Sequence, residues 1–246
     1  MSEILIRQAK ETSEGDSVDV KRLFPIPGND GYMNYDPFVL WDHFTVKPGS
    51  GFPEHPHRGF EAITYMFSGS MKHTDNLGNE SQITAGGAQR FTAGKGIIHS
   101  EMPGSEGSNQ GIQLWINLPS RLKKMEPEYQ EVLTENIPEE ESEGVRVRTI
   151  VGETSPLKLR TVVEYAEVNI GSGKTWKKII AQGMRGFIYL VKGSLDVNGQ
   201  QIETAGAIFV DEVTDITVTA NEESQFMFCT GMPHGEPIRQ WGPYVD

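Results

Sequence analysis

Residues 51–70 read GFPEHPHRGFEAITYMFSGS, and the second half of this stretch decides the fold because a version of it returns later in the chain. ITYMFSGS at 63–70 matches FIYLVKGS at 187–194. Further on, ITAG at 83–86 matches ETAG at 203–206, with a hairpin four residues shorter. Self-similarity of this kind is a primary fold signal. The sequence therefore predicts a β unit that occurs twice.

The residues around both copies are short apolar runs separated by glycine turns. The chain has 27 Gly and 14 Pro in 246 residues, a composition that favours many turns and short strands over long helices. We expect an all-β protein made of two sandwiches or barrels. The predicted division is a first barrel at 1–132, an acidic linker at 133–144 (LTENIPEEESEG) and a second barrel at 145–246.

Composition excludes several classes of function. A net charge of -12 argues against direct nucleic-acid binding, which needs clustered Lys and Arg. No apolar run approaches the roughly 18 residues of a membrane span, and nothing resembles a signal peptide. Cys229 is the single cysteine, so no intramolecular disulfide can form. We expect a soluble cytoplasmic protein, or a nuclear one in a eukaryote.

Two pairs of metal-binding residue types lie in the first copy. His55 and His57 are two positions apart on a predicted strand, and so are His99 and Glu101. Residues i and i+2 of a strand point to the same face. A single histidine on a strand is usually an ordinary core or surface residue, but two such pairs inside one β unit favour a metal site.

The same stretches resemble the pirin family of the cupin superfamily. The resemblance is dense from about 36 to 132 and returns near the end of the chain. It is carried by DPFVLWDHF (36–44), HPHRGFE (55–61), TAGKGIIHSEMP (92–103), QLWINLP (113–119), EPEYQE (126–131) and GEPIRQWGPYV (235–245).

This resemblance implies a bicupin fold with two jelly-roll-like β-barrels packed face to face, and a mononuclear iron site in the first. The family pattern places the ligands at His55, His57, His99 and Glu101. General cupins often use an earlier glutamate, here Glu61, which we interpret as a structural or supporting carboxylate.

Alignment of Tyr189 on Tyr65 places Ile179 and Ala181 at the positions of the first two histidines. The second barrel should therefore bind no metal.

Three imidazoles and one carboxylate leave two positions open on a six-coordinate ion. This suits Fe(II), while Mn, Ni, Co and Cu fit the same ligand set. Candidate supporting residues are Asp42, His43 and Gln113. The candidate substrate pocket comprises Phe52, Arg58, Phe60, Gln113 and Trp115, although salt bridging for Arg58 and core packing for the aromatic residues are the simpler alternatives.

Some pirin-like proteins cleave quercetin with dioxygen. The resemblance thus implies a metal-dependent dioxygenase for a small aromatic substrate such as a flavonol, with Glu101 as the catalytic base. The alternative is a redox-responsive regulator that binds a transcription factor or a metabolic enzyme. RLKK (121–124) and KTWKK (174–178) are candidate contacts for such a partner, or simply solvated faces. A binding module with a structural metal is the third possibility. We expect no direct contact with nucleic acid or membrane.

Overall fold

The structure is a computed structural model that describes residues 5–26, 34–104, 106–211 and 215–246. Within these ranges the helices are two short 3₁₀ turns, η1 (Ser120–Leu122) and η2 (Thr134–Asn136), and no helix there is long and apolar enough to cross a membrane. The chain forms two compact units. The first unit is Lys10–Ile137 with His234–Asp246, and the second is Met1–Ala9 with Pro138–Pro233.

The first unit contains a seven-stranded and a four-stranded antiparallel sheet. The larger sheet has the order β12-β9-β6-β11-β4-β3-β2 and the smaller has the order β5-β10-β7-β8. Their bounds are β2 (Lys10–Glu14), β3 (Val18–Phe24), β4 (Phe38–Val46), β5 (Phe52–His57), β6 (Phe60–Ser68), β7 (Ser70–Asp75), β8 (Glu80–Thr84), β9 (Ala88–Thr92), β10 (Ile97–Pro103), β11 (Asn109–Asn117) and β12 (Glu128–Val132).

The second unit has the same two sheets. Their orders are β1-β20-β17-β22-β15-β14-β13 and β16-β21-β18-β19. The bounds are β1 (Leu5–Gln8), β13 (Glu139–Ser142), β14 (Val145–Val151), β15 (Val163–Ile170), β16 (Thr175–Ile179), β17 (Arg185–Lys192), β18 (Ser194–Val197), β19 (Gln200–Glu203), β20 (Gly206–Val210), β21 (Asp215–Ala220) and β22 (Ser224–Gly231). The predicted all-β class and the duplicated β unit are confirmed.

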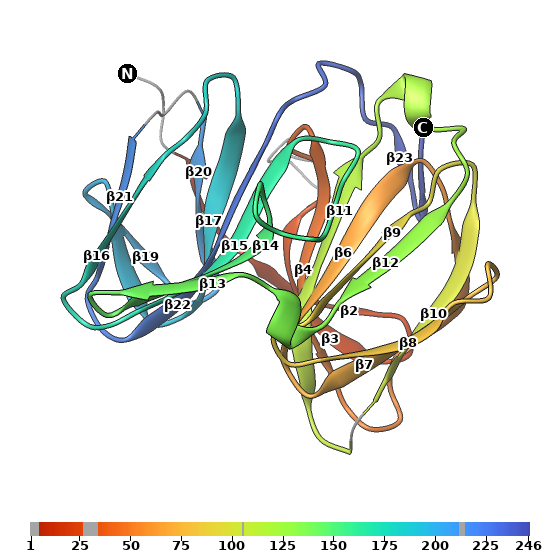
Figure 1. The fold of residues 1–246 in the computed structure, drawn as a ribbon, viewed down its shortest axis with the longest axis horizontal. Helices are drawn as coiled ribbons and strands as arrows, with labels where there is room; N and C mark the ends of the chain where they lie inside the picture. The colour runs from red at the N-terminus through yellow and green to blue at the C-terminus, as the bar shows by residue number, and fades with distance from the viewer. Residues whose placement is uncertain (1–4, 27–33, 105, 212–214) are drawn as a thin grey trace. The chain divides into compact units, whose positions relative to one another are not determined.

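Each unit is completed by a segment from the far end of the chain. β1 pairs with β20 in the second unit, while the C-terminal hairpin of β23 (Gln240–Trp241) and β24 (Tyr244–Val245) belongs to the first. In Figure 1 the blue C-terminal segment with β23 runs beside the strands of the first unit.

The structure differs from the predicted boundaries here. The two compact units meet between Ile137 and Pro138, which lies inside the predicted linker. Within that stretch β13 is a strand paired with β14 and not a free connection.

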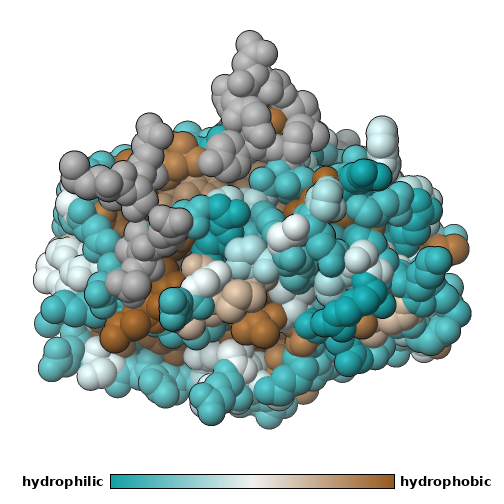
Figure 2. All heavy atoms as spheres, turned by 90° about the horizontal axis from the view of Figure 1, so that it is seen from above, coloured by the Kyte–Doolittle hydropathy of each residue, from teal (hydrophilic) through white to brown (hydrophobic). Residues whose placement is uncertain are grey.

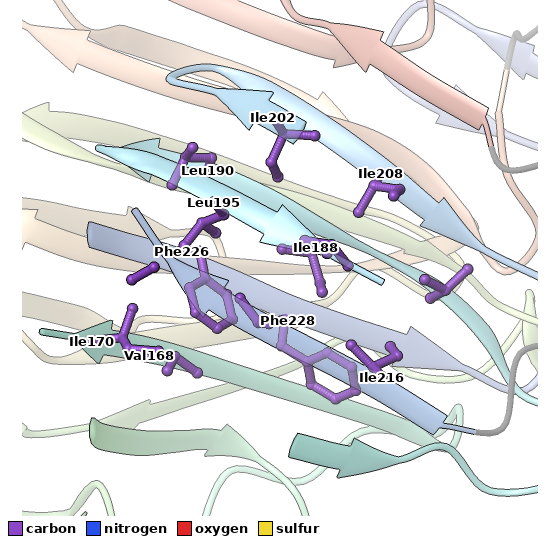
Figure 3. Packing of buried hydrophobic residues seen from close by; sticks show 14 of the residues in the cluster. Val168, Ile170, Ile188, Leu190, Leu195, Ile202, Ile208, Ile216, Phe226 and Phe228 are labelled. Carbon is purple, nitrogen blue, oxygen red and sulfur yellow. The ribbon is translucent and has the colours of Figure 1, made fainter. Parts of the chain in front are cut away.

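The second unit is filled by one apolar cluster (Figure 3). Ile188, Ile208, Ile216, Phe226 and Phe228 extend from different strands into a shared core. The members of this cluster are apolar throughout, and nearly all are less than a twentieth exposed. A cluster packed in this way offers a cation no side-chain nitrogen or oxygen.

The first unit instead has separate apolar clusters with polar residues between them. On β6, Phe60 and Ala62 join one cluster and Met66 joins another. Thr64 lies between them on the same face of the strand and is buried. The buried polar positions of this band are the ones that build the site.

Outside, the molecule is hydrophilic. The face in Figure 2 is mainly teal, with apolar residues in small groups, as expected for a chain with a net charge of -12.

Candidate metal centre

Three histidines converge inside the first unit. His55 and His57 lie on β5, and His99 lies on the neighbouring strand β10, where it pairs directly with His55. One ring nitrogen from each of the three lies within 4.8 Å of the other two. Antiparallel pairing of β5 with β10 thus joins residues that are more than 40 positions apart in the sequence.

Each histidine turns its Nδ1 toward another group. The distance from Nδ1 to the carbonyl oxygen of Pro53 is 2.7 Å for His55, and to that of Pro243 it is 3.2 Å for His57. A carbonyl only accepts, so both Nδ1 atoms carry the proton. The Nδ1 of His99 lies 3.4 Å from Nδ1 of His73. In a neutral imidazole a protonated Nδ1 leaves Nε2 as a bare lone pair, which is the form that binds metals.

The spacing of the Nε2 atoms fits a metal ion. The Nε2 atoms of His55 and His99 are 3.1 Å apart. Two nitrogens bound to one ion at about 2.1 Å and at a right angle lie about 3.0 Å apart. Two bare lone pairs this close repel each other unless a cation lies beside both. The residues present therefore fit a divalent metal held by three imidazoles.

Glu101 stands beside this three-histidine cluster. Its side chain is 2% exposed, and its carboxylate is held by three neutral donors. Oε1 accepts from Thr64 Oγ1 and Gln89 Nε2, both at 2.7 Å, and Oε2 accepts from Gln113 Nε2 at 2.7 Å. The cluster that the geometry defines contains the three histidines without this carboxylate. The role of Glu101 as a fourth ligand stays a prediction.

Burial lowers the pKa of two of the site histidines, His57 and His99. Burial, followed by the nearby His99 and His55, lowers the pKa of His57 to about 2. Burial and the neighbouring His55 likewise put the pKa of His99 well below its usual value. Metals bind neutral imidazole, so these side chains are available as ligands without first losing a proton.

A cavity of about 560 Å³ opens on the site. His55, His57 and Glu101 line it together with apolar and acidic side chains. This volume is in the range of small-molecule sites. The remaining lining residues are Glu14, Gly15, Asp16, Arg22, Leu40, Asp42, Phe44, Phe52, Pro53, Glu54, Gln113, Trp115, Gln240, Gly242 and Pro243.

Among the described lining residues, Arg22 carries a positive charge, and neighbouring carboxylates neutralise it. Arg22 donates to both carboxylate oxygens of Asp42, at 2.8 and 2.6 Å, and its guanidinium lies 2.8 Å from the carboxylate of Glu14. Burial raises the pKa of Asp42 to about 6 despite this pairing. The described residues of this wall therefore offer acceptors to a ligand's hydroxyl groups and no unpaired positive charge.

The C-terminal segment forms part of the site, and residues 240–246 are called the strap here. The backbone of Val245 donates to Arg58, and Lys123 Nζ donates to the carbonyl of Val245 at 2.9 Å. A Cβ on Gly59 would lie 1.8 Å from that carbonyl oxygen, so only glycine admits the strap at this distance. The strap places the carbonyl oxygen of Pro243 within 3.2 Å of Nδ1 of His57.

The predicted pocket residues divide into two groups. Phe52, Gln113 and Trp115 line the cavity. Phe60 is fully buried and stacks on Trp115, with ring centroids 4.1 Å apart. Arg58 bonds to Asp246 and lies over the Tyr244 ring, which matches the salt-bridge alternative and leaves it outside the lining residues.

The candidate supporting residues also separate. Gln113 holds Glu101, while Asp42 pairs with Arg22 in the cavity wall. His43, the next residue along β4, has its ring against Phe67 instead, because neighbouring strand residues face opposite sides. Glu61 is buried and accepts from Thr92 Oγ1 at 2.8 Å, so its contacts are structural.

Strand pairing identifies the counterparts of the site in the second unit. Tyr65 and Tyr189 are equivalent, and the pairings of β10 and β21 then align His99 with Ile216 and Glu101 with Val218. The counterparts of His55 and His57 are Lys178 and Ile180, one residue earlier than the predicted Ile179 and Ala181.

The residues around Glu101 are replaced together with it. Ile188, Ile208 and Phe228 stand where the first unit has Thr64, Gln89 and Gln113. All three are members of the apolar cluster of Figure 3. Apart from Lys178 at the position of His55, the second unit thus has hydrophobic residues at the positions of both the ligands and their supports.

Sequence reasoning did not single out the residues behind the histidines. His73 and Asp75 form another i, i+2 pair on β7, and this spacing was a usable signal. Thr64, Gln89 and Tyr129 are scattered single residues on three strands. The contact with Pro243 joins positions 186 residues apart, which no local pattern could indicate.

Comparison with known proteins agrees with this geometry. The Pirin family model matches residues 18–116, and the Pirin C-terminal cupin domain matches 165–246. A pirin-like protein of Solanum lycopersicum is 37% identical, covering 96% of this chain and 84% of its own. Pirin of Homo sapiens is 38% identical with the same coverage.

Solved structures give the same architecture. A quercetin 2,3-dioxygenase from Acinetobacter baumannii is 27% identical with a TM-score of 0.89, covering 98% of this chain and 90% of its own. A bacterial pirin from Escherichia coli, solved in complex with nickel(II), is 24% identical with a TM-score of 0.79 over 94% of this chain and 99% of its own, and it supports the fold alone. The matches to both family models and the identity with curated relatives show that the chain described here belongs to the pirin family.

Proposed function

We propose that the protein is a metal-dependent dioxygenase that opens the ring of a small polyhydroxylated aromatic substrate of the flavonol type. The observation that carries the proposal is the convergence of one ring nitrogen each from His55, His57 and His99 within 4.8 Å of one another, beside the Glu101 carboxylate at a cavity of about 560 Å³. The likeness to a solved quercetin 2,3-dioxygenase supports it.

His55, His57 and His99 would hold the ion, with Glu101 as the fourth ligand. Iron is the proposed metal, and Mn, Ni, Co and Cu suit the same donors. A bound ion of this kind supplies a Lewis acid and an electron relay between substrate and dioxygen.

Glu101 is the proposed base for a substrate hydroxyl. Its Oε1 receives two hydrogen bonds and its Oε2 only the one from Gln113, so Oε2 keeps one lone pair, which would hold the ion and would take the proton when Glu101 is transiently released from it. The apolar side chains of Phe52 and Trp115 would flank the aromatic rings and exclude water.

The acidic wall favours a substrate without a fixed negative charge. Glu14, Asp16 and Glu54 line the same cavity, and Arg22 is already paired. Phenolic hydroxyls can donate to these carboxylates, whereas a carboxylate on the substrate would be repelled.

The test is oxygen uptake with quercetin by protein loaded anaerobically with Fe(II). The expected reaction consumes one dioxygen per flavonol, keeps both oxygen atoms in the products and releases one carbon as carbon monoxide. Uptake should vanish in His99→Ala and persist in His43→Ala, which removes a histidine outside the site. Absence of uptake from protein that demonstrably holds iron would overturn the proposal.

One observation favours the alternative of a metal-responsive regulator of a transcription factor or metabolic enzyme. The strap connects His57 to the surface, where Trp241 is 69% exposed. A change at the ligand could thus alter an exposed aromatic segment. The basic clusters give less support, because Lys123 is bonded to the carbonyl of Val245 and Lys178 is paired with Glu164. Either function is proposed for the cytoplasm, or also the nucleus in a eukaryotic cell.

A further inference from the structure

Behind the three histidines, on the side away from the cavity, lies a polar network that the proposed reaction does not use. It comprises His73, Asp75, Ser81, Gln89 and Tyr129, and none of these is among the cavity-lining residues. His73 is 0% exposed and Gln89 is 1% exposed. Buried polar side chains are costly unless they are satisfied, so their arrangement here calls for a physical role.

The first arm of this network leads to His99. Nε2 of His73 lies 3.0 Å from Oδ2 of Asp75, whose carboxylate also accepts from the backbone N–H groups of Leu77 and Asn79. An ionised carboxylate only accepts, so Nε2 of His73 carries a proton and Nδ1 of the same ring faces His99. The metal-binding form of His99 has a bare Nε2 toward His55, so its Nδ1 carries the proton and donates to Nδ1 of His73, 3.4 Å away.

The second arm leads to Glu101. The hydroxyl of Tyr129 donates to Oε1 of Gln89 at 3.0 Å. This contact fixes which end of the amide is the carbonyl, so the NH₂ group of Gln89 must face Glu101, to which it donates at 2.7 Å. Ser81 Oγ contacts the Tyr129 hydroxyl from the other side.

Both arms meet at Tyr129. Besides its hydrogen bond to Gln89, its ring stacks on the ring of His73, with centroids 4.3 Å apart and planes at 17°. The residue lies on the edge strand β12, which pairs with β9 next to Gln89. Its ring thus contacts one arm while its hydroxyl contacts the other.

The second unit gives an independent comparison. Strand pairing aligns His73 with Val197 and Gln89 with Ile208. Both arms are therefore absent at the positions where the ligands are also absent. Residues needed only for packing of the barrel would have no reason to change together with the ligands.

We propose that Tyr129 is a positioning residue for two ligand side chains at once. Its ring stacks on His73 and fixes the orientation of that ring, which in turn keeps the proton of His99 on Nδ1. Its hydroxyl orients the amide of Gln89, which in turn orients the carboxylate of Glu101. This role requires the three-histidine site of the proposed function but not its reaction, and its test needs no turnover.

The test separates the two parts of the side chain. Tyr129→Phe keeps the stacking and removes the hydroxyl, Tyr129→Leu removes both, and His73→Phe keeps a stacked ring without the relay. Two measurements are made on each full-length variant. The first is ¹⁵N NMR of the histidine side chains in metal-free protein, which reports the tautomer. The second is Co(II) affinity by competition with a chelator.

We expect His99 to keep its proton on Nδ1 in wild type and Tyr129→Phe, and to populate both tautomers in Tyr129→Leu and His73→Phe. Loss of supports of this type typically costs about 10–100-fold in metal affinity. Tyr129→Leu should therefore bind Co(II) at least about tenfold more weakly than wild type, and Tyr129→Phe should fall between them. Tyr189→Phe in the second unit is the matched control and should leave affinity unchanged.

The proposal is overturned if the His99 tautomer is the same in all variants and their Co(II) affinities stay within about twofold of wild type. If Tyr129→Leu does not fold, the pair Tyr129→Phe and His73→Phe still decides. Of these two variants, only Tyr129→Phe should weaken Co(II) binding without changing the tautomer of His99. Failure of the oxygen-uptake experiment would leave these outcomes untouched, so the two proposals fail separately.

Discussion

Two buried carboxylates of the first unit, Glu61 and Glu101, show how surroundings assign a role to a residue. Both are almost completely buried. Glu61 accepts from Thr92 and is not among the residues that line the cavity. Glu101 lines the cavity next to His55 and His57, with three neutral donors around it. Only the second is placed to act on a bound metal or substrate.

A pair of isosteric variants tests this assignment. Glu101→Gln replaces an oxygen that accepts by an amide nitrogen that donates, so it should lower metal affinity at least about tenfold. Glu61→Gln should leave affinity within about twofold while lowering thermal stability. Isothermal titration with Fe(II) under anaerobic conditions and a thermal melt measure both quantities. A larger loss of affinity in Glu61→Gln would reverse the assignment.

At the scale of elements, the strap depends on one lysine. Lys123 Nζ donates to the carbonyl oxygens of Gly59 and Val245 and to Oδ1 of Asn117, at 2.8–3.0 Å. Burial lowers the pKa of Lys123 to about 8, although Asp246 and Glu236 oppose the shift. Lys123 therefore joins the strap to Gly59 and Asn117, beside the contacts that Arg58 makes with Val245 and Asp246.

Removal of this ammonium should loosen the strap. In Lys123→Met three acceptors lose their donor, at a cost of about 1–3 kcal/mol for each that stays buried. We expect faster amide hydrogen exchange in residues 240–246 and weaker metal binding. Lys124→Met, the neighbouring and more exposed position, is the matched control. Unchanged exchange in Lys123→Met would show that other contacts hold the strap.

The sheets of the second unit contribute packing in place of ligands. Phe228→Ala would leave a cavity in the cluster of Figure 3, and such changes typically cost about 3–5 kcal/mol. Chemical denaturation should show this loss, while the metal content of the folded protein stays the same. Ile179→Ala, at a side chain 75% exposed, should be nearly neutral. A fall in metal content of folded Phe228→Ala would contradict this division of roles.

At the scale of the whole molecule, buried histidines set the response to acid. Burial is the largest cause that lowers the pKa of His57 to about 2, that of His43 to about 4, and that of His99 well below 6.5. As pH falls through 6.5 the unfolded chain takes up protons on these three groups and the folded metal-free chain does not. Unfolding free energy must then decrease.

Asp42 acts in the opposite direction. Burial raises its pKa from 3.8 to about 6, so the folded state takes up this proton first and gains stability as pH falls between these values. The protons that the unfolded chain takes up on these histidines outnumber the one that the folded chain takes up on Asp42. The unfolding free energy of metal-free protein should therefore decrease as pH falls from 6.5 toward 5.

Urea titrations at a series of pH values between 4.5 and 6.5 measure this slope. His43→Asn removes one of these histidine protons without touching the metal site, so its slope should be shallower than that of wild type. An equal slope in both proteins would show that His43 is not held neutral by burial.

Local patterns in the sequence determined the all-β class, the duplication and the three histidines, because strand alternation and a repeat are short-range features. They also placed Phe52, Gln113 and Trp115 at the cavity. What only the tertiary structure decided depends on contacts between distant strands. The strap on His57, the donors around Glu101 and the two arms meeting at Tyr129 come from chain folding alone. Hydrogen bonds between residues far apart in sequence leave no periodic trace in it, and register shifts of one residue, as at Lys178 and Ile180, are set by loop length and core packing.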